Sequence, residues 1–172
     1  MKVDTLTALL SHATSTNQQA SLLPALPTVD ALLPTLALSA RRSVLESLSL
    51  ALASTPSGYT YTLQYLRTFP QGSPLTLPTL KLAKSAVKQG LLDVSKALDL
   101  ASLPCLSSVE DHSRGLIKLL RLYVDATLDD FDKYLSSDAG KKVVADEGLD
   151  VAILQENMKV RERGAVVGPP NC

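Results

Sequence analysis

The sequence predicts an all-α protein, and three observations lead to this prediction. Leu, Ala and Val supply most of the 45% hydrophobic fraction, whereas aromatic residues make up only 4% and Trp is absent. This composition suits helix-on-helix packing better than a β-sandwich, whose strands favour β-branched and aromatic residues. The other two observations are long stretches, 109–135 and 78–103, with apolar residues at helical spacing. We therefore expect a single-domain helical bundle or short helical array of five to seven helices.

The length of the chain sets the expected domain organisation. At 172 residues it is long enough for one domain with a substantial core and short for two. We expect a short helix and polar linker over residues 1–20, a helical domain over 21–163 and a flexible C-terminal tail over 164–172. Within the first range, Asp4 is the expected N-cap of a helix at residues 3–13, and residues 14–19 form the linker.

The next stretch combines apolar residues with prolines. Leu-Leu-Pro occurs at residues 22–24 and again at 32–34, and each Pro pushes the preceding residue towards extended geometry. We interpret residues 21–28 as an ordered apolar segment over the core. A helix should follow from Thr28 or Leu33 to Ser54, with a break near Arg42 as the alternative, because residues 43–46 have the form of a capping box. Residues 54–58 should end this helix.

Residues 59–69 fit two periods. Strict alternation of large residues and the Tyr and Thr content favour a strand, whereas helical spacing aligns Tyr59, Leu63, Leu66 and Phe69. A strand without a partner strand is unstable, so we predict a helix. The aromatic residues form two groups in the sequence, and we expect them to be buried, with an aromatic surface for a partner as the alternative.

The two strongest helical patterns should form the centre of the fold. Pro78 should open a helix that runs to about Leu103, with Gly90 at a close crossing, and Pro104 should end it. Because a short connection leads to the helix at 109–135, we expect an antiparallel hairpin 78–103/109–135. Residues 136–140 should break the pattern, and one or two helical turns should follow at 141–147. A helix at 150–163, capped by Asp150, is expected to end the domain, with a hairpin near Glu156 as the alternative.

Charge, cysteine content and hydropathy narrow the classes of function. The 17 basic and 17 acidic residues balance, so we expect no nucleic acid as the main partner. Cys105 and Cys172 do not make a disulfide framework. The sequence contains neither a signal-peptide pattern nor a transmembrane segment, which predicts a soluble chain in the cytoplasm or nucleus, unless it is a processed product. A homo-oligomer is left open.

The sequence contains few residue patterns that indicate catalysis, so the candidate sites are surfaces that could contact other proteins. His12 and His112 lack metal-ligand spacing, no nucleophile or phosphate-loop motif occurs, and we expect no enzyme activity and no cofactor. The candidate protein contacts are an acidic helix face, a basic helix face and an apolar edge within residues 21–40: Asp125, Asp129, Asp132, Lys81, Lys84, Lys88, Leu22, Leu23 and Leu26. On one continuous helix, the three acids would lie towards its C-terminal end and oppose the helix dipole.

Three functions are compatible with these patterns. The first is a non-catalytic helical scaffold or adaptor, a protein-binding subunit of a multiprotein complex. The second is a carrier with a cavity between helices for an apolar small molecule or lipid. The third is a Mg²⁺-dependent enzyme that uses the face of Asp125, Asp129 and Asp132.

Overall fold

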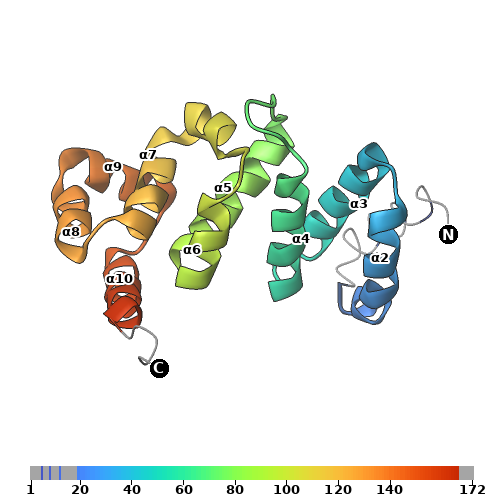
Figure 1. Cartoon of the computed structure of the whole chain (residues 1–172), viewed down its shortest axis with the longest axis horizontal. Coiled ribbons are helices and arrows are strands. Elements are labelled where there is room, and N and C mark those ends of the chain that lie inside the picture. Colours follow the sequence, from blue (N-terminus) through green and yellow to red (C-terminus); the bar gives the residue numbers. More distant parts are fainter. Residues whose placement is uncertain (1–4, 6–7, 9–11, 13–18, 167–172) are drawn as a thin grey trace, which may run out of the picture. The chain divides into compact units, whose positions relative to one another are not determined.

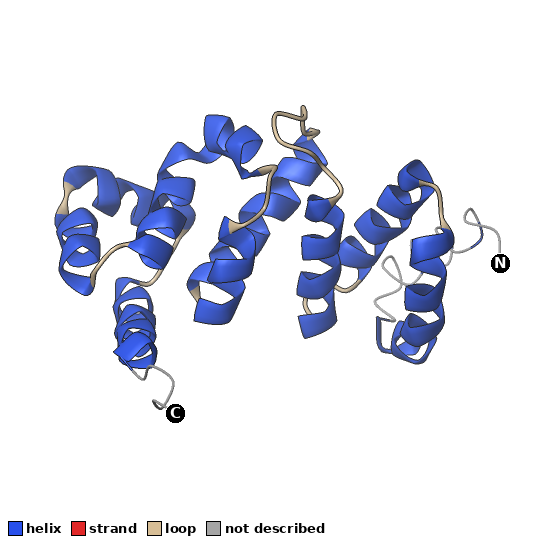
Figure 2. Ribbon diagram, in the orientation of Figure 1, coloured by secondary structure: helices blue, strands red, loops and turns tan. Residues whose placement is uncertain are grey.

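The computed structural model describes residues 19–166 and, before them, the single residues Thr5, Ala8 and His12. In this part of the chain every regular element is helical and no β-strand occurs, which confirms the all-α class (Figure 2). The same part contains nine α-helices and two short 3-10 helices, so the predicted number of five to seven is wrong. The helix expected at residues 3–13 and the tail beyond residue 166 lie outside the described residues. The chain divides into two compact units, residues 1–70 and 71–172.

The first unit is built around a pair of helices. Three short elements, η1 (Gln19–Ala25), α2 (Leu26–Leu32) and η2 (Leu33–Thr35), precede α3 (Leu38–Ala51) and α4 (Pro56–Arg67). Helices α3 and α4 pack against each other (Figure 1), and their buried side chains include Leu45 and Leu48 from α3 and Leu66 from α4. Helix α4 confirms the helical interpretation of residues 59–69.

The break before α3 does not lie at the predicted capping box. The backbone is extended at Leu36 and Ala37, with ψ of 146° and 151°, and α3 begins directly afterwards. Ser43 lies inside α3, where its carbonyl accepts a hydrogen bond of 2.9 Å from the Ser47 hydroxyl. The alternative break near Arg42 is therefore wrong.

The described part of the second unit, up to residue 166, contains six helices. They are α5 (Leu77–Leu91), α6 (Val94–Ala101), α7 (Leu106–Asp125), α8 (Leu128–Ser136), α9 (Asp138–Glu147) and α10 (Val151–Val166). Helices α5, α6 and α7 pack on one another, α8 packs on α9, and α10 contacts both α6 and α8 (Figure 1). Gly90 of α5 lies at a close approach to α6, because a Cβ there would overlap the side chain of Leu100.

The predicted central hairpin of helices 78–103 and 109–135 is wrong, because each stretch forms two helices. The first breaks at Asp93, whose carboxylate accepts a hydrogen bond of 3.1 Å from the Ser95 N–H. The second breaks at Thr127, whose hydroxyl accepts one of 3.3 Å from the Asp130 N–H. Such caps satisfy N–H groups at a new helix start and compete with continuation of the old helix.

The apolar stripe of residues 109–135 continues across this break. Leu116 and Tyr123 of α7 are buried, and so are Phe131 and Leu135 of α8. Hydrophobic spacing reports which face of the chain is buried, and it is the same on both sides of the break. Helix α7 also bends at Ser113, which has non-helical dihedral angles of −147° and 47°.

Two glycines that look like helix breakers in the sequence lie inside the first turn of the next helix. Gly58 in α4 and Gly140 in α9 donate their N–H groups to the capping hydroxyls of Thr55 (3.2 Å) and Ser137 (3.1 Å). A Cβ at Gly58 would lie 3.0 Å from the Ala53 nitrogen, and one at Gly140 would lie 3.0 Å from Cα of Leu135. The missing side chain therefore allows each helix to start in close contact with the backbone before it.

The last two elements agree with the local signals. Gly148 ends α9 in the left-handed conformation with φ of 61°, which glycine adopts without a steric penalty. The Asp150 carboxylate accepts a hydrogen bond of 2.8 Å from the Ala152 N–H. Helix α10 follows and excludes the hairpin near Glu156, and it continues beyond Arg163 to Val166.

Candidate binding surfaces

The three aspartates of the predicted acidic face do not share one helix. Asp125 is the last residue of α7, Asp129 is in the first turn of α8, and Asp132 follows one turn later. Asp129 therefore lies at the positive end of a helix dipole, opposite to the expectation. Asp132 is half-buried and accepts a hydrogen bond of 2.8 Å from the Gln155 side-chain amide. The continuous carboxylate face on which the Mg²⁺ hypothesis depends is thus absent from the described helices.

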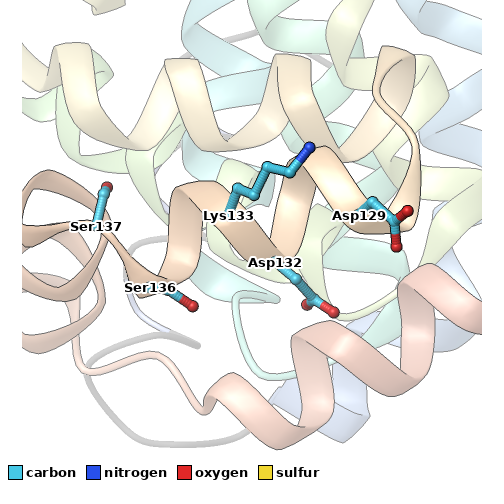
Figure 3. A pocket seen from close by; sticks show the side chains of 5 residues that line it. All are labelled: Asp129, Asp132, Lys133, Ser136 and Ser137. Atoms are coloured by element: carbon cyan, nitrogen blue, oxygen red, sulfur yellow. The ribbon is translucent and has the colours of Figure 1, made fainter.

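A hollow of about 560 Å³ lies beside two of these aspartates, and its lining consists of Asp129, Asp132, Lys133, Ser136 and Ser137. Figure 3 shows that the Lys133 side chain points away from Asp132 and Ser136, so the labelled groups do not converge on one point. Within the described residues, no group of three or more His, Cys, Asp or Glu side chains is placed to hold a metal ion. This hollow lacks the convergent geometry of a metal or catalytic site.

The lysines of the predicted basic face are divided between solvent and an internal contact. Lys81 is exposed, whereas the ammonium groups of Lys84 and Lys88 lie 2.6 Å and 2.9 Å from the carboxylate oxygens of Glu147. Lys88 also donates a hydrogen bond of 2.8 Å to the Glu147 main-chain carbonyl at the C-terminus of α9. Two of the three lysines thus connect α5 to α9.

The Glu147 carboxyl responds to this environment. Burial raises its pKa, but hydrogen bonds and charge from Lys84 and Lys88 act in the opposite direction and lower it below the ordinary value. The carboxylate therefore stays charged in the folded chain at neutral pH.

The apolar edge predicted from Leu22, Leu23 and Leu26 borders a groove in the first unit. Leu22 and Leu26 are half-buried, and Leu23 is 46% exposed. A hollow of about 360 Å³ is bounded on one side by η1 and α2 and on the other by α4. We call it the α2–α4 groove, and its lining is Leu23, Leu26, Pro27, Asp30, Ser57, Thr60, Tyr61 and Gln64.

The two walls of the α2–α4 groove differ in chemistry. Leu23, Leu26 and Pro27 make an apolar wall, while the side chains from α4 are mostly polar. Asp30 and Tyr61 join the walls, because the Tyr61 hydroxyl donates a hydrogen bond of 2.8 Å to Oδ1 of Asp30. The groove therefore combines an apolar surface with one oriented carboxylate.

Sequence reasoning missed both members of this pair. Asp30 is a single acid among leucines and prolines, and Tyr61 belongs to an aromatic-rich helix, so neither stands out in the sequence. Leu26 and Asp30 are four residues apart and share a helix face, which is the one local signal that places the acid beside the apolar edge. The pairing with Tyr61, 31 residues later, depends on tertiary packing.

A second set of missed residues lies on α10 and stabilises the junction between α7 and α8. The Arg161 guanidinium donates to the main-chain carbonyl of Tyr123 at 2.8 Å and also to those of Val124 and Ala126. The Glu162 carboxylate accepts a hydrogen bond of 2.6 Å from the Leu128 N–H. A cation thus meets the C-terminus of α7 and an anion the N-terminus of α8, as the two helix dipoles favour. The basic residue Arg161 is structural rather than a free surface charge.

Two titratable side chains, Tyr123 and Cys105, are buried in the second unit. Tyr123 is fully buried, and burial raises the pKa of its hydroxyl to about 12, with the Asp93 charge as a further cause. Cys105 is also fully buried, and burial raises the pKa of its thiol. A protonated, inaccessible thiol is a poor nucleophile.

Comparison of the chain with models of protein families, with curated proteins and with solved structures gives no significant match. Among the described helices, none has the length and apolar character that a membrane span requires.

Proposed function

We propose that the protein is a non-catalytic helical adaptor that binds another protein through the α2–α4 groove. The observation that carries this proposal is the position of the predicted apolar edge. Leu23 and Leu26 line a groove that also contains oriented polar groups, instead of being covered by the described part of the first unit. Protein-binding surfaces commonly combine apolar anchors with polar groups that set orientation.

The size of the groove suits a partner segment. A volume of about 360 Å³ lies near the lower end of the range of about 300–1,000 Å³ that is typical of small-molecule pockets, so the groove has room for a side chain of a partner segment. The carrier alternative needs an enclosed apolar cavity, and the two hollows described above are open and contain polar side chains. We therefore favour a protein partner, and we infer a cytoplasmic location for the complex.

The test compares two exposed leucines of the first unit. Leu23 lines the groove and is 46% exposed, and Leu50 of α3 does not line it and is 49% exposed. Because both side chains are on the surface, Leu23→Asp and Leu50→Asp should change the free energy of unfolding by similar small amounts, about 0.5 kcal/mol or less. The full-length chain and both variants are used for affinity purification from cells that express the protein.

The proposal predicts a partner that copurifies with the wild type and with Leu50→Asp but not with Leu23→Asp. Direct binding of that purified partner is then measured by calorimetry with the same three chains. Equal recovery of all partners by both variants would overturn the assignment of the groove. Recovery of no partner by the wild type would overturn the adaptor function.

A further inference from the structure

The α2–α4 groove carries a charge that its own lining does not balance. Among the described residues that line it, Asp30 is the one acidic side chain, and none is Lys, Arg or His. Within the described part of the chain, Asp30 accepts a hydrogen bond from Tyr61 and forms no ion pair. Arg42, a basic side chain of α3, is engaged elsewhere, because its Nε donates to the Thr68 hydroxyl at 3.0 Å.

Tyr61 holds this carboxylate in place. The Tyr61 side chain is 4% exposed and its hydroxyl points at Oδ1 of Asp30, 2.8 Å away. Burial and the nearby carboxylate both raise the pKa of Tyr61, so the phenol stays protonated and remains a donor. A neutral donor orients the carboxylate without cancelling its charge.

The surroundings of Asp30 define what would complement it. A carboxylate is a strong acceptor for an ammonium or guanidinium group. Leu23, Leu26 and Pro27 lie on the same side of the groove and suit the methylene chain that carries such a group in lysine or arginine, since these side chains bury their stems against apolar surface.

We propose that the α2–α4 groove selects a partner segment that inserts a lysine or arginine side chain, with its aliphatic stem on Leu23 and Leu26 and its charged end at Asp30. This inference rests on the proposed adaptor function and adds the chemistry of the partner to it. Tyr61 is a positioning residue in this arrangement, because it acts on the cation through Asp30.

The test uses three small probes that share one alkyl chain and differ only in the end group: n-hexylammonium, 1-hexanol and hexanoate. Hexylammonium stands for a lysine side chain. Each probe is titrated into the isotopically labelled full-length chain, and NMR shifts at Leu23, Leu26 and Asp30 report binding in the groove. We expect hexylammonium to bind about two- to fivefold more tightly than hexanol, and hexanoate to bind most weakly.

Two acid-to-amide variants locate the effect. Asp30→Asn removes the carboxylate charge with little change in shape, and Glu46→Gln is the matched control, because it removes one negative charge from the same unit outside the groove. Hexylammonium should bind Asp30→Asn no better than hexanol does, while the affinity of hexanol should not change. Glu46→Gln should retain the preference for the ammonium group.

Three results would overturn the inference: equal binding of hexylammonium and hexanol, an ammonium preference that survives in Asp30→Asn, or no shifts at the groove up to the solubility of the probes. Each can occur while the copurifying partner still depends on Leu23, in which case the adaptor function stands and only the cation preference fails. Conversely, an ammonium preference without any Leu23-dependent partner would reject protein binding through the α2–α4 groove while leaving a cation-binding groove.

Discussion

Replacing Gly140 by Ala should destabilise the folded chain, although helix propensity alone predicts the opposite. Gly140 lies in the first turn of α9, where a Cβ would overlap the main-chain oxygen of Tyr134 and would lie 2.8 Å from its carbonyl carbon. These are backbone atoms, so a change of side-chain rotamer cannot relieve the overlap. The last turn of α8 would have to move.

The magnitude follows from what such a movement disturbs. The Tyr134 carbonyl accepts hydrogen bonds from the Ser137 hydroxyl at 2.6 Å and from the Ser137 N–H at 3.0 Å. Overpacking of this kind typically costs about 1–3 kcal/mol, whereas Ala gains at most about 1 kcal/mol over Gly in helix propensity. Because the overlap is with backbone atoms, the upper part of this range applies, and we expect a net loss of about 1–2 kcal/mol in the free energy of unfolding.

The assay is urea unfolding followed by far-ultraviolet circular dichroism. The matched control is Ala139→Gly at the exposed neighbouring position, which should lose about 0.5–1 kcal/mol from propensity alone. Together the two variants would show that Ala is favoured at one position and Gly at the next. A Gly140→Ala chain that is as stable as the wild type, or more stable, would refute the close approach between α8 and α9.

Three further predictions concern other parts of the structure. Because the folded-state pKa of Glu147 is lowered, the charged carboxylate stabilises the fold above the unfolded-state pKa, and this stabilisation is lost as the pH falls through the folded-state pKa. The difference in melting temperature between the wild type and Glu147→Gln should therefore narrow as the pH falls below about 4.5. A difference that stays constant with pH would contradict this. Arg161→Met should lower the free energy of unfolding by about 1–3 kcal/mol in urea, since it leaves carbonyls at the α7 C-terminus without a charged donor, whereas exposed Arg163→Met should change it little. Acrylamide should quench tyrosine fluorescence weakly, because four of the tyrosines are at most 6% exposed, namely Tyr59, Tyr61, Tyr65 and Tyr123. Efficient quenching of most tyrosines would contradict this burial.

Local sequence signals determined much of the fold. Apolar spacing predicted the all-α class and the buried faces of the chain, including Leu116 and Phe131. Asp150 and Gly148 predicted a helix start and a helix end, because capping and a left-handed backbone depend on one or two residues. The apolar edge at Leu23 and Leu26 was also apparent, since an excess of leucine in a proline-rich stretch needs no tertiary information.

Tertiary structure alone decided where the long helices break and which charges meet. Asp93 and Thr127 resemble ordinary polar surface residues until the chain turns at them, and the α7–α8 junction is stabilised by Arg161 and Glu162 more than 30 residues away. The Asp30–Tyr61 pair likewise joins residues 31 positions apart. Helical spacing is the same on both sides of a break, and a hydrogen bond between distant residues depends on how helices pack, so apolar periodicity reveals neither feature.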